Sequence, residues 1–150
     1  MWQGILGHDR IVAQFREVLR SGRLASTFLF VGPEGIGKRV FARQWAKGLL
    51  CEKGGSEPLD PCGMCGSCRL VDADTHPDLH SVAKPADKQS LPIELFIGAR
   101  AQRNQAGLCH QIALRPMLGQ RRVAIIDDAD YLRQESANCL LKTLEEPPPG

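Results

Sequence analysis

The chain has 150 residues, of which 43% are hydrophobic and 24% charged, and its formal net charge is +2. This length and composition are typical of one compact globular domain. The small charge surplus excludes an overall basic protein of the kind that binds nucleic acid through its general charge. The sequence shows neither a signal peptide nor an apolar run of membrane-spanning length, so we expect a cytoplasmic protein with no membrane contact.

The pattern of apolar residues predicts helix, strand, glycine loop and helix, in that order, in the first third of the chain. Apolar residues recur at helical spacing from Ile11 to Leu19 and predict an amphipathic helix. Residues 28–31, Phe-Leu-Phe-Val, form an unbroken apolar run typical of a strand buried on both faces. A second helix is expected to begin near Gly37. Its buried side is expected to carry Phe41, Ala42, Trp45 and Leu49.

The rest of the chain alternates loops, strands and helices. Residues 52–61 are rich in Gly, Ser, Pro and charge, which predicts a loop, and the stretch 91–97 is compatible with either a strand or a helix. The other expected elements are a weak strand at 79–83, a helix at 108–114, a strand at 123–126 and a helix at about 134–146. The last helix is expected to bury Ala137, Leu140, Leu141 and Leu144. This alternation predicts an α/β domain with a mainly parallel sheet flanked by helices.

A phosphate-binding motif lies between the first predicted strand and the second helix. Residues 32–38, GPEGIGK, fit the pattern G-x-x-x-x-G-K. The backbone N–H groups of such a loop and the N-terminus of the following helix cradle phosphates, while the lysine supplies charge toward the outer phosphates. A glycine turn without a ligand is the alternative interpretation. The candidate nucleotide-binding residues are Gly32, Gly35, Gly37, Lys38 and Arg39.

Two positions depart from the pattern of an active nucleotide hydrolase. Arg39 stands where Ser or Thr normally ligates Mg²⁺, and its guanidinium has no acceptor atom. Asp127 and Asp128 follow the predicted strand at 123–126, where the acidic motif usually reads Asp-Glu. Asp127 takes the metal-side position, whereas Asp128 is shorter by one methylene, about 1.5 Å, than the glutamate that orients the attacking water. The two aspartates are catalytic candidates by position only, with a solvated strand end as the alternative.

Four of the six cysteines predict a metal site. Cys51 precedes a C-x-x-C-x-x-C motif formed by Cys62, Cys65 and Cys68, a spacing that suits tetrahedral Zn²⁺ in an insertion at about residues 51–68. An iron–sulfur cluster is the main alternative, but Asp72 stands where the ferredoxin pattern has its fourth cysteine. The insertion has few apolar residues, so we expect zinc to hold it together.

The remaining cysteines and two histidines have simpler interpretations. Cys109 and Cys139 lie on the apolar faces of predicted helices and are expected to be small core residues. His76 and His80 lie near the cysteine motif, but four cysteines already complete a site, so neither is expected to be a ligand.

Together these motifs resemble one family, the bacterial clamp-loader AAA+ subunits. Residues 5–8, Ile-Leu-Gly-His, are similar to the family's adenine-side motif, the four cysteines to its zinc insertion, and residues 75–78, Thr-His-Pro-Asp, follow where the family has them. Residues 140–148, LLKTLEEPP, are similar to the helix after the acidic motif in the gamma/tau and delta-prime subunits of DNA polymerase III. The resemblance covers almost the whole chain and is weakest at 84–105.

The resemblance implies a P-loop NTPase domain of the AAA+ class over residues 1–150. Gamma/tau subunits hydrolyse ATP, whereas delta-prime subunits typically have a defective phosphate loop, so Arg39 favours the delta-prime branch with weak or non-hydrolysed ATP or ADP. The implied role is in a hetero-pentamer with gamma/tau and delta subunits, which opens the sliding clamp and loads it on primer–template DNA. The family's sensor region, lid, collar and trans-acting Ser-Arg-Cys arginine lie outside residues 1–150, so we expect a part of a longer protein.

Two other functions stay open. The first is an active gamma/tau-type ATPase in which Asp127 and a water-held Mg²⁺ compensate for Arg39. The second is a zinc-ribbon nucleic-acid-binding module that keeps a vestigial nucleotide fold. Such a module needs basic and aromatic residues around the cysteines, and the loop has Lys53 and Arg69 but no aromatic residue. Nucleotide occupancy and the role of residues 91–105 also stay open.

Overall fold

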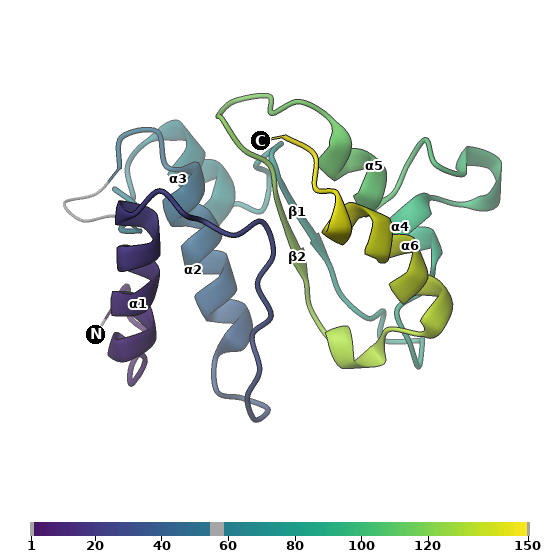
Figure 1. Ribbon diagram of the computed structural model, residues 1–150, viewed down its shortest axis with the longest axis horizontal. Coiled ribbons are helices and arrows are strands. Elements are labelled where there is room, and N and C mark those ends of the chain that lie inside the picture. Colours follow the sequence, from purple (N-terminus) through teal and green to yellow (C-terminus); the bar gives the residue numbers. More distant parts are fainter. Residues whose placement is uncertain (1, 55–58, 150) are drawn as a thin grey trace. The chain divides into compact units, whose positions relative to one another are not determined.

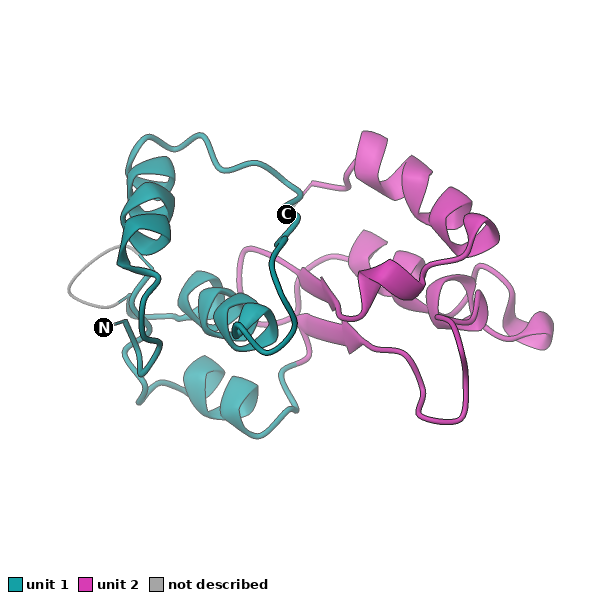
Figure 2. Cartoon of the chain, turned by 90° about the horizontal axis from the view of Figure 1, so that it is seen from below, with its two compact units in different colours: residues 1–76 teal, residues 77–150 magenta. Residues whose placement is uncertain are grey.

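The computed structural model describes residues 2–54 and 59–149 and divides the chain into two compact units. Unit 1 comprises residues 1–76 and unit 2 comprises residues 77–150 (Figure 2). Each unit buries its own hydrophobic cluster, although the length of the chain suits a single domain. None of the helices in the described ranges is long and apolar enough to cross a membrane.

The helices of unit 1 are α1 (Asp9–Arg20), α2 (Lys38–Leu50) and α3 (Gly66–Asp72) (Figure 1). The first two confirm the helices predicted from residue 11 and from about residue 37. The predicted Ala42 and Leu49 are only half-buried and lie at the edges of the buried face of α2. The fully buried residues of this helix are Phe41, Trp45, Ala46 and Leu50.

Aromatic side chains from three segments make the core of unit 1. The ring centroid of Trp45 lies 4.0 Å from that of Phe15 and 4.3 Å from that of Phe28. Phe30 joins this group through an edge contact with Phe41, with the centroids 5.4 Å apart. Large rings from α1, from α2 and from the segment before the glycine loop therefore stabilise the unit. The buried members of the cluster are Trp2, Ile5, Val12, Phe41, Trp45 and Leu59.

The predicted strand at 28–31 is wrong as a strand buried on both faces. The structure assigns it no strand, and its side chains alternate. Phe28 and Phe30 are half-buried against the unit 1 core, whereas Leu29 is 78% and Val31 85% exposed. A strand needs a hydrogen-bonded neighbour, and no described residue pairs with this segment, so only one face of it is covered. The described sheet is therefore smaller than that of a complete P-loop domain.

Unit 2 contains a two-stranded parallel sheet of β1 (Leu79–Val82) and β2 (Val123–Ile126), in which Leu79 pairs with Val123. Both strands confirm the predictions. The helices α4 (Glu94–Ile97), α5 (Leu108–Ala113) and α6 (Gln134–Glu145) lie on one side of these strands (Figure 1). The helices α5 and α6 were predicted within a residue at each end. Short 3-10 turns occupy Arg100–Gln102 and Ala129–Tyr131. The core of unit 2 is formed by Leu91, Phe96, Leu108 and Leu140.

The ambiguous stretch 91–97 contains elements of both kinds. Leu91 forms an isolated parallel bridge with Leu132, and α4 follows as a single helical turn that buries Phe96 completely. A Cβ atom on Gly107 would lie 2.6 Å from the Phe96 carbonyl oxygen, and Gly107 has φ +86°. Only glycine suits both requirements, so this position fixes the approach of α5 to α4.

The buried face of α6 differs from the predicted one. Leu140 is buried as expected and Ala137 is half-buried, but Leu141 is 49% and Leu144 42% exposed. The hydroxyl of Ser136, a buried residue, donates a 3.0 Å hydrogen bond to the Leu91 carbonyl. This bond satisfies the buried hydroxyl, and Ser136 and Leu140 are the buried residues of the helix.

Candidate metal and nucleotide sites

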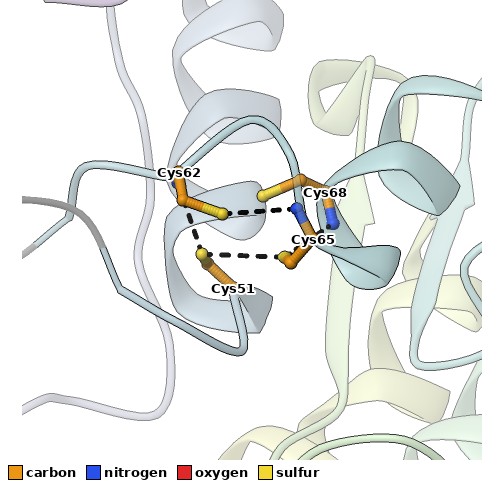
Figure 3. Close-up of side chains that lie close together, drawn as sticks. All are labelled: Cys51, Cys62, Cys65 and Cys68. Carbon is orange, nitrogen blue, oxygen red and sulfur yellow. Dashed lines mark hydrogen bonds between the residues drawn. The ribbon is translucent and has the colours of Figure 1, made fainter.

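The four predicted metal ligands converge in unit 1 (Figure 3). Cys51 follows the last residue of α2, Cys62 lies in the loop, and Cys65 and Cys68 lie at the start of α3. All four sulfur atoms lie within 4.8 Å of one another, and the Sγ atoms of Cys51 and Cys65 are 3.9 Å apart. Tetrahedral Zn²⁺ with Zn–S bonds of about 2.3 Å needs sulfur atoms about 3.8 Å apart, so the cluster has the size of a zinc site.

Backbone N–H groups support the sulfur atoms. The amides of Cys62, Cys65 and Cys68 donate to the sulfurs of Cys51, Cys62 and Cys65, each at 3.4 Å. The N–H groups of Met64 and Cys65 lower the pKa of the Cys62 thiol to about 6, which favours the thiolate form. Burial raises the pKa of Cys68 to about 12. A bound cation would offset that burial cost, since metal binding requires all ligating thiols to be deprotonated.

The cysteine insertion is anchored by more than its cysteines, which corrects the expectation that it lacks apolar support. Leu59 is 5% exposed and belongs to the unit 1 core. Its carbonyl packs on Gly48, where a Cβ atom would lie 2.3 Å from the oxygen. The Asp60 carboxylate accepts hydrogen bonds from Trp2 Nε1 at 2.8 Å and from Arg16 at 2.9 Å. Residues 55–58 of the predicted loop lie outside the described residues.

Neither nearby histidine lies in the ligand set. The four cysteines are the one metal-type cluster found among residues 2–54 and 59–149. His76 Nε2 lies 3.2 Å from the Ser67 hydroxyl, and His80 Nε2 lies 2.9 Å from an Arg122 nitrogen. The other two cysteines are half-buried and pack on the unit 2 core, where burial raises the pKa of Cys109. These two are therefore core residues, as predicted.

The glycine loop in unit 1 leads directly into α2. Gly35 and Gly37 have φ of +77° and +94°, conformations that disfavour other residues, and Gly37 is the N-cap of the helix. The first turn of α2 carries no acidic residue that would neutralise the positive end of the helix dipole. Lys38 Nζ donates to the Gly32 and Pro33 carbonyls, both at 2.9 Å, and so lies over the loop. Arg39 is exposed.

His8, in the segment before α1, contacts the same loop. His8 Nε2 lies 3.1 Å from the Ile36 carbonyl oxygen, and the His8 ring makes an edge contact with Phe41. This histidine therefore links the segment before α1 to the glycine loop and to the first turns of α2.

The acidic residues lie in unit 2, at the carboxyl end of β2. The Asp127 backbone N–H donates to the Val82 carbonyl at 2.8 Å and extends the strand pairing. Asp128 adopts a left-handed conformation with φ +54°, and its carboxylate accepts from the Lys84 backbone N–H at 3.2 Å. The structure thus gives Asp128 a structural contact within unit 2. The glycine loop belongs to unit 1.

A buried charged network in unit 2 was missed by sequence reasoning. Asp78 is 0% exposed, and its carboxylate accepts from the backbone N–H groups of residues 117, 118 and 119 at 2.7, 2.8 and 3.4 Å. Arg122 Nε lies 3.6 Å from Asp78, and Arg122 also donates to His80 and to the carbonyls of Gln111 and Arg115. The one available signal was Asp78 in the Thr-His-Pro-Asp run, noted only as a resemblance.

Comparison with known proteins identifies the family of the chain. The family described as "DNA polymerase III, delta subunit" matches residues 7–150. The chain belongs to this DNA polymerase III subunit family. The clamp-loader resemblance of the motifs is thereby confirmed at the level of the family.

The relatives within DNA polymerase III include two kinds of subunit. The "DNA polymerase III subunit delta'" of Pseudomonas aeruginosa is 38% identical over 123 residues, 82% of this chain and 34% of that protein. The delta' subunit of Bacillus subtilis is 31% identical over 138 residues, 92% of this chain and 38% of that protein. The tau/gamma subunit of Haemophilus influenzae is 32% identical over 145 residues, 96% of this chain and 19% of that protein. The chain therefore spans well under half the length of these relatives.

Proposed function

We propose that the chain is part of a delta-prime-like subunit of a bacterial clamp loader. In this role the whole protein joins gamma/tau and delta subunits in a hetero-pentamer in the cytoplasm, which loads the sliding clamp on primer–template DNA for DNA polymerase III. The family match supports the clamp-loader assignment. Arg39 favours a delta-prime over a gamma/tau subunit, because it directly follows the phosphate-loop lysine, at the position of a Mg²⁺-ligating hydroxyl.

Residues 1–150 act in this proposal as the nucleotide-binding AAA+ domain, whose phosphate loop binds ATP or ADP without efficient hydrolysis. The backbone of Gly32, Gly35 and Gly37 faces the phosphates. When nucleotide binds, the Lys38 ammonium leaves the two loop carbonyls to which it donates and pairs with the outer phosphates instead. Asp127 stands at the metal-side position of the acidic motif, as the resemblance implies, at the carboxyl end of β2. Arg39 brings a fixed positive charge but no ligand for Mg²⁺, and Asp128 already accepts a hydrogen bond from Lys84.

The cysteine cluster serves as a structural zinc site. The support is the closed set of four sulfurs within 4.8 Å, which leaves no ligand position for a substrate. Bound zinc would connect the end of α2 to the start of α3 and close the insertion at about residues 51–68. Zinc is preferred over an iron–sulfur cluster because Asp72, at the end of α3, occupies the position of the further cysteine in the ferredoxin pattern.

An active gamma/tau-type ATPase is the second candidate, because tau/gamma relatives align over 96% of the chain. The two candidates differ in ATP turnover. We expect the full-length protein, alone and with its partner subunits, to hydrolyse ATP no faster than its own Lys38→Ala variant. A wild-type rate well above that of the variant would overturn the delta-prime assignment and leave the family assignment intact.

A further inference from the structure

Glu52, Ser67 and His76 form a chain of hydrogen bonds beside the cysteine cluster. Glu52 Oε1 accepts from the Ser67 backbone N–H at 2.9 Å and from the Ser67 hydroxyl at 3.0 Å. His76 Nε2 lies 3.2 Å from the same hydroxyl. The hydroxyl has one proton, which it donates to Glu52, so its oxygen accepts from His76 Nε2–H. Hydrogen-bond donation therefore runs in one direction, from His76 to Ser67 and from Ser67 to Glu52.

These hydrogen bonds join the two segments that carry the cysteines. Glu52 directly follows Cys51, and Ser67 directly precedes Cys68 in the first turn of α3. Ser67 and His76 are 2% and 5% exposed, so little water reaches their side of these bonds, whereas Glu52 is exposed. A Cβ atom on Gly66 would lie 3.3 Å from Glu52 Oε1, so the glycine leaves room for the carboxylate. The helices α2 and α3 are also linked by the ion pair of Lys47 with Asp72, and the Glu52 contacts add a further link at the cysteine end of both helices.

We propose that Glu52, Ser67 and His76 are positioning residues for the metal, an inference that rests on the proposed zinc site. They ligate nothing themselves. The two hydrogen bonds that Ser67 donates to Glu52 hold Cys51 against Cys65 and Cys68, and His76 fixes the orientation of the serine hydroxyl. These contacts bring the four sulfurs together before the metal binds. Metal binding therefore costs less conformational entropy. Once the metal is bound, the same contacts keep a sulfur that dissociates close enough to bind again.

The experiment measures how fast the full-length protein releases zinc to excess EDTA, with a chromogenic zinc dye as the readout. Outer hydrogen bonds of metal sites typically change metal affinity about 10–100-fold, so we expect Glu52→Ala and Ser67→Ala each to speed release by about 10-fold or more. Glu17→Ala and Ser21→Ala are matched controls on the exposed surface of α1 and should release zinc at the wild-type rate. Glu52→Gln keeps an acceptor oxygen and should restore slow release.

A purely structural role would lower the unfolding temperature without changing zinc release from the folded protein, so release is measured under native conditions with far-UV circular dichroism as a check of folding. Glu52→Ala removes both bonds to Ser67, whereas Ser67→Ala removes the hydroxyl bonds to Glu52 and His76 and keeps the backbone N–H bond, so Glu52→Ala is the stricter test. Wild-type release by folded Glu52→Ala or Ser67→Ala overturns the positioning role, and so does release by Glu52→Gln as fast as by Glu52→Ala. If the wild-type protein binds neither zinc nor cobalt, the zinc site itself fails instead.

Discussion

The Asp60 carboxylate accepts a 2.8 Å hydrogen bond from the indole N–H of Trp2, which connects the cysteine insertion to the start of the chain. The same carboxylate pairs with Arg16 on α1. We expect Asp60→Ala to lower the free energy of unfolding by about 1–3 kcal/mol, because both donors lose their partner in a partly buried place. Urea unfolding followed by tryptophan fluorescence measures the change.

Asp72→Ala is the matched control for that change. Asp72 also pairs with a cation, Lys47, but its side chain is 55% exposed. Exposed ion pairs contribute about 0–1 kcal/mol, so this variant should stay close to the wild type. Equal losses for the two variants would show that the insertion is not anchored through Asp60.

Zinc removal should loosen the insertion locally. We expect about one zinc per chain by elemental analysis, as for a closed four-thiolate site, and chelation should raise amide exchange mainly in residues 62–68. The amides of α2 should keep their protection, because they are hydrogen-bonded within a helix that packs on the unit 1 core. Iron in the purified protein, or loss of protection in β1 and β2 at the same chelator concentration, would contradict this expectation.

Asp78 should matter for the stability of unit 2. Replacement by Asn removes a buried charge that accepts three backbone hydrogen bonds and faces Arg122, so we expect a loss of about 3 kcal/mol or more. Asp87→Asn changes an exposed aspartate of the same unit and should have little effect. Similar urea midpoints for the two variants would rule out this role for Asp78.

The same aspartate predicts a pH dependence. Burial alone would raise the pKa of Asp78, but the N–H groups of Leu118, Met117 and Gly119, together with Arg122, hold it below its usual 3.8. The carboxylate therefore stabilises the fold fully above the unfolded pKa, and this contribution is lost as the pH falls toward the lower folded pKa. Stability should fall over that range in the wild type and fall less in Asp78→Asn. Equal slopes would contradict the prediction.

Local patterns predicted the elements that depend on local sequence. The helical spacing before Ser21, the glycine loop and the valine- and isoleucine-rich run at 123–126 each led to an element that the structure contains. The cysteine spacing likewise predicted a cluster that the structure brings together. These signals work because helix periodicity, turn preference and ligand spacing act over short stretches of chain.

Features that depend on distant partners were not predictable in the same way. Residues 28–31 have the composition of a buried strand, but pairing requires a neighbour that composition does not name. The buried face of α6 packs on residues distant in sequence, such as Leu91, which accepts a hydrogen bond from Ser136, 45 residues away. Leu59 lies in a turn, as the loop prediction expected, but its burial was missed because its carbonyl packs on Gly48, a contact that local sequence does not indicate.

Arg39 should determine how nucleotide binding responds to magnesium. We expect Arg39→Thr to make ADP binding stronger in the presence of Mg²⁺, because a hydroxyl that can ligate the metal replaces a cation that cannot. ATP turnover should stay low, since Asp128 is still short for positioning water. Titration of a fluorescent ADP analogue with and without Mg²⁺ measures the effect. Arg39→Lys is the matched control and should bind as the wild type does; a Mg²⁺ response as large as that of Arg39→Thr would refute this role.

Clamp loading by a reconstituted ring tests the delta-prime assignment most directly. The ring is assembled from gamma/tau, delta and the full-length protein carrying Lys38→Ala, and its rate of loading clamps on primed DNA is compared with the wild-type ring. The substitution removes the charge that the outer phosphates need at this one site. We predict unchanged loading, because this subunit contributes no hydrolysis of its own. Loss of loading by a ring that still assembles would show that the site is catalytic and would contradict the assignment.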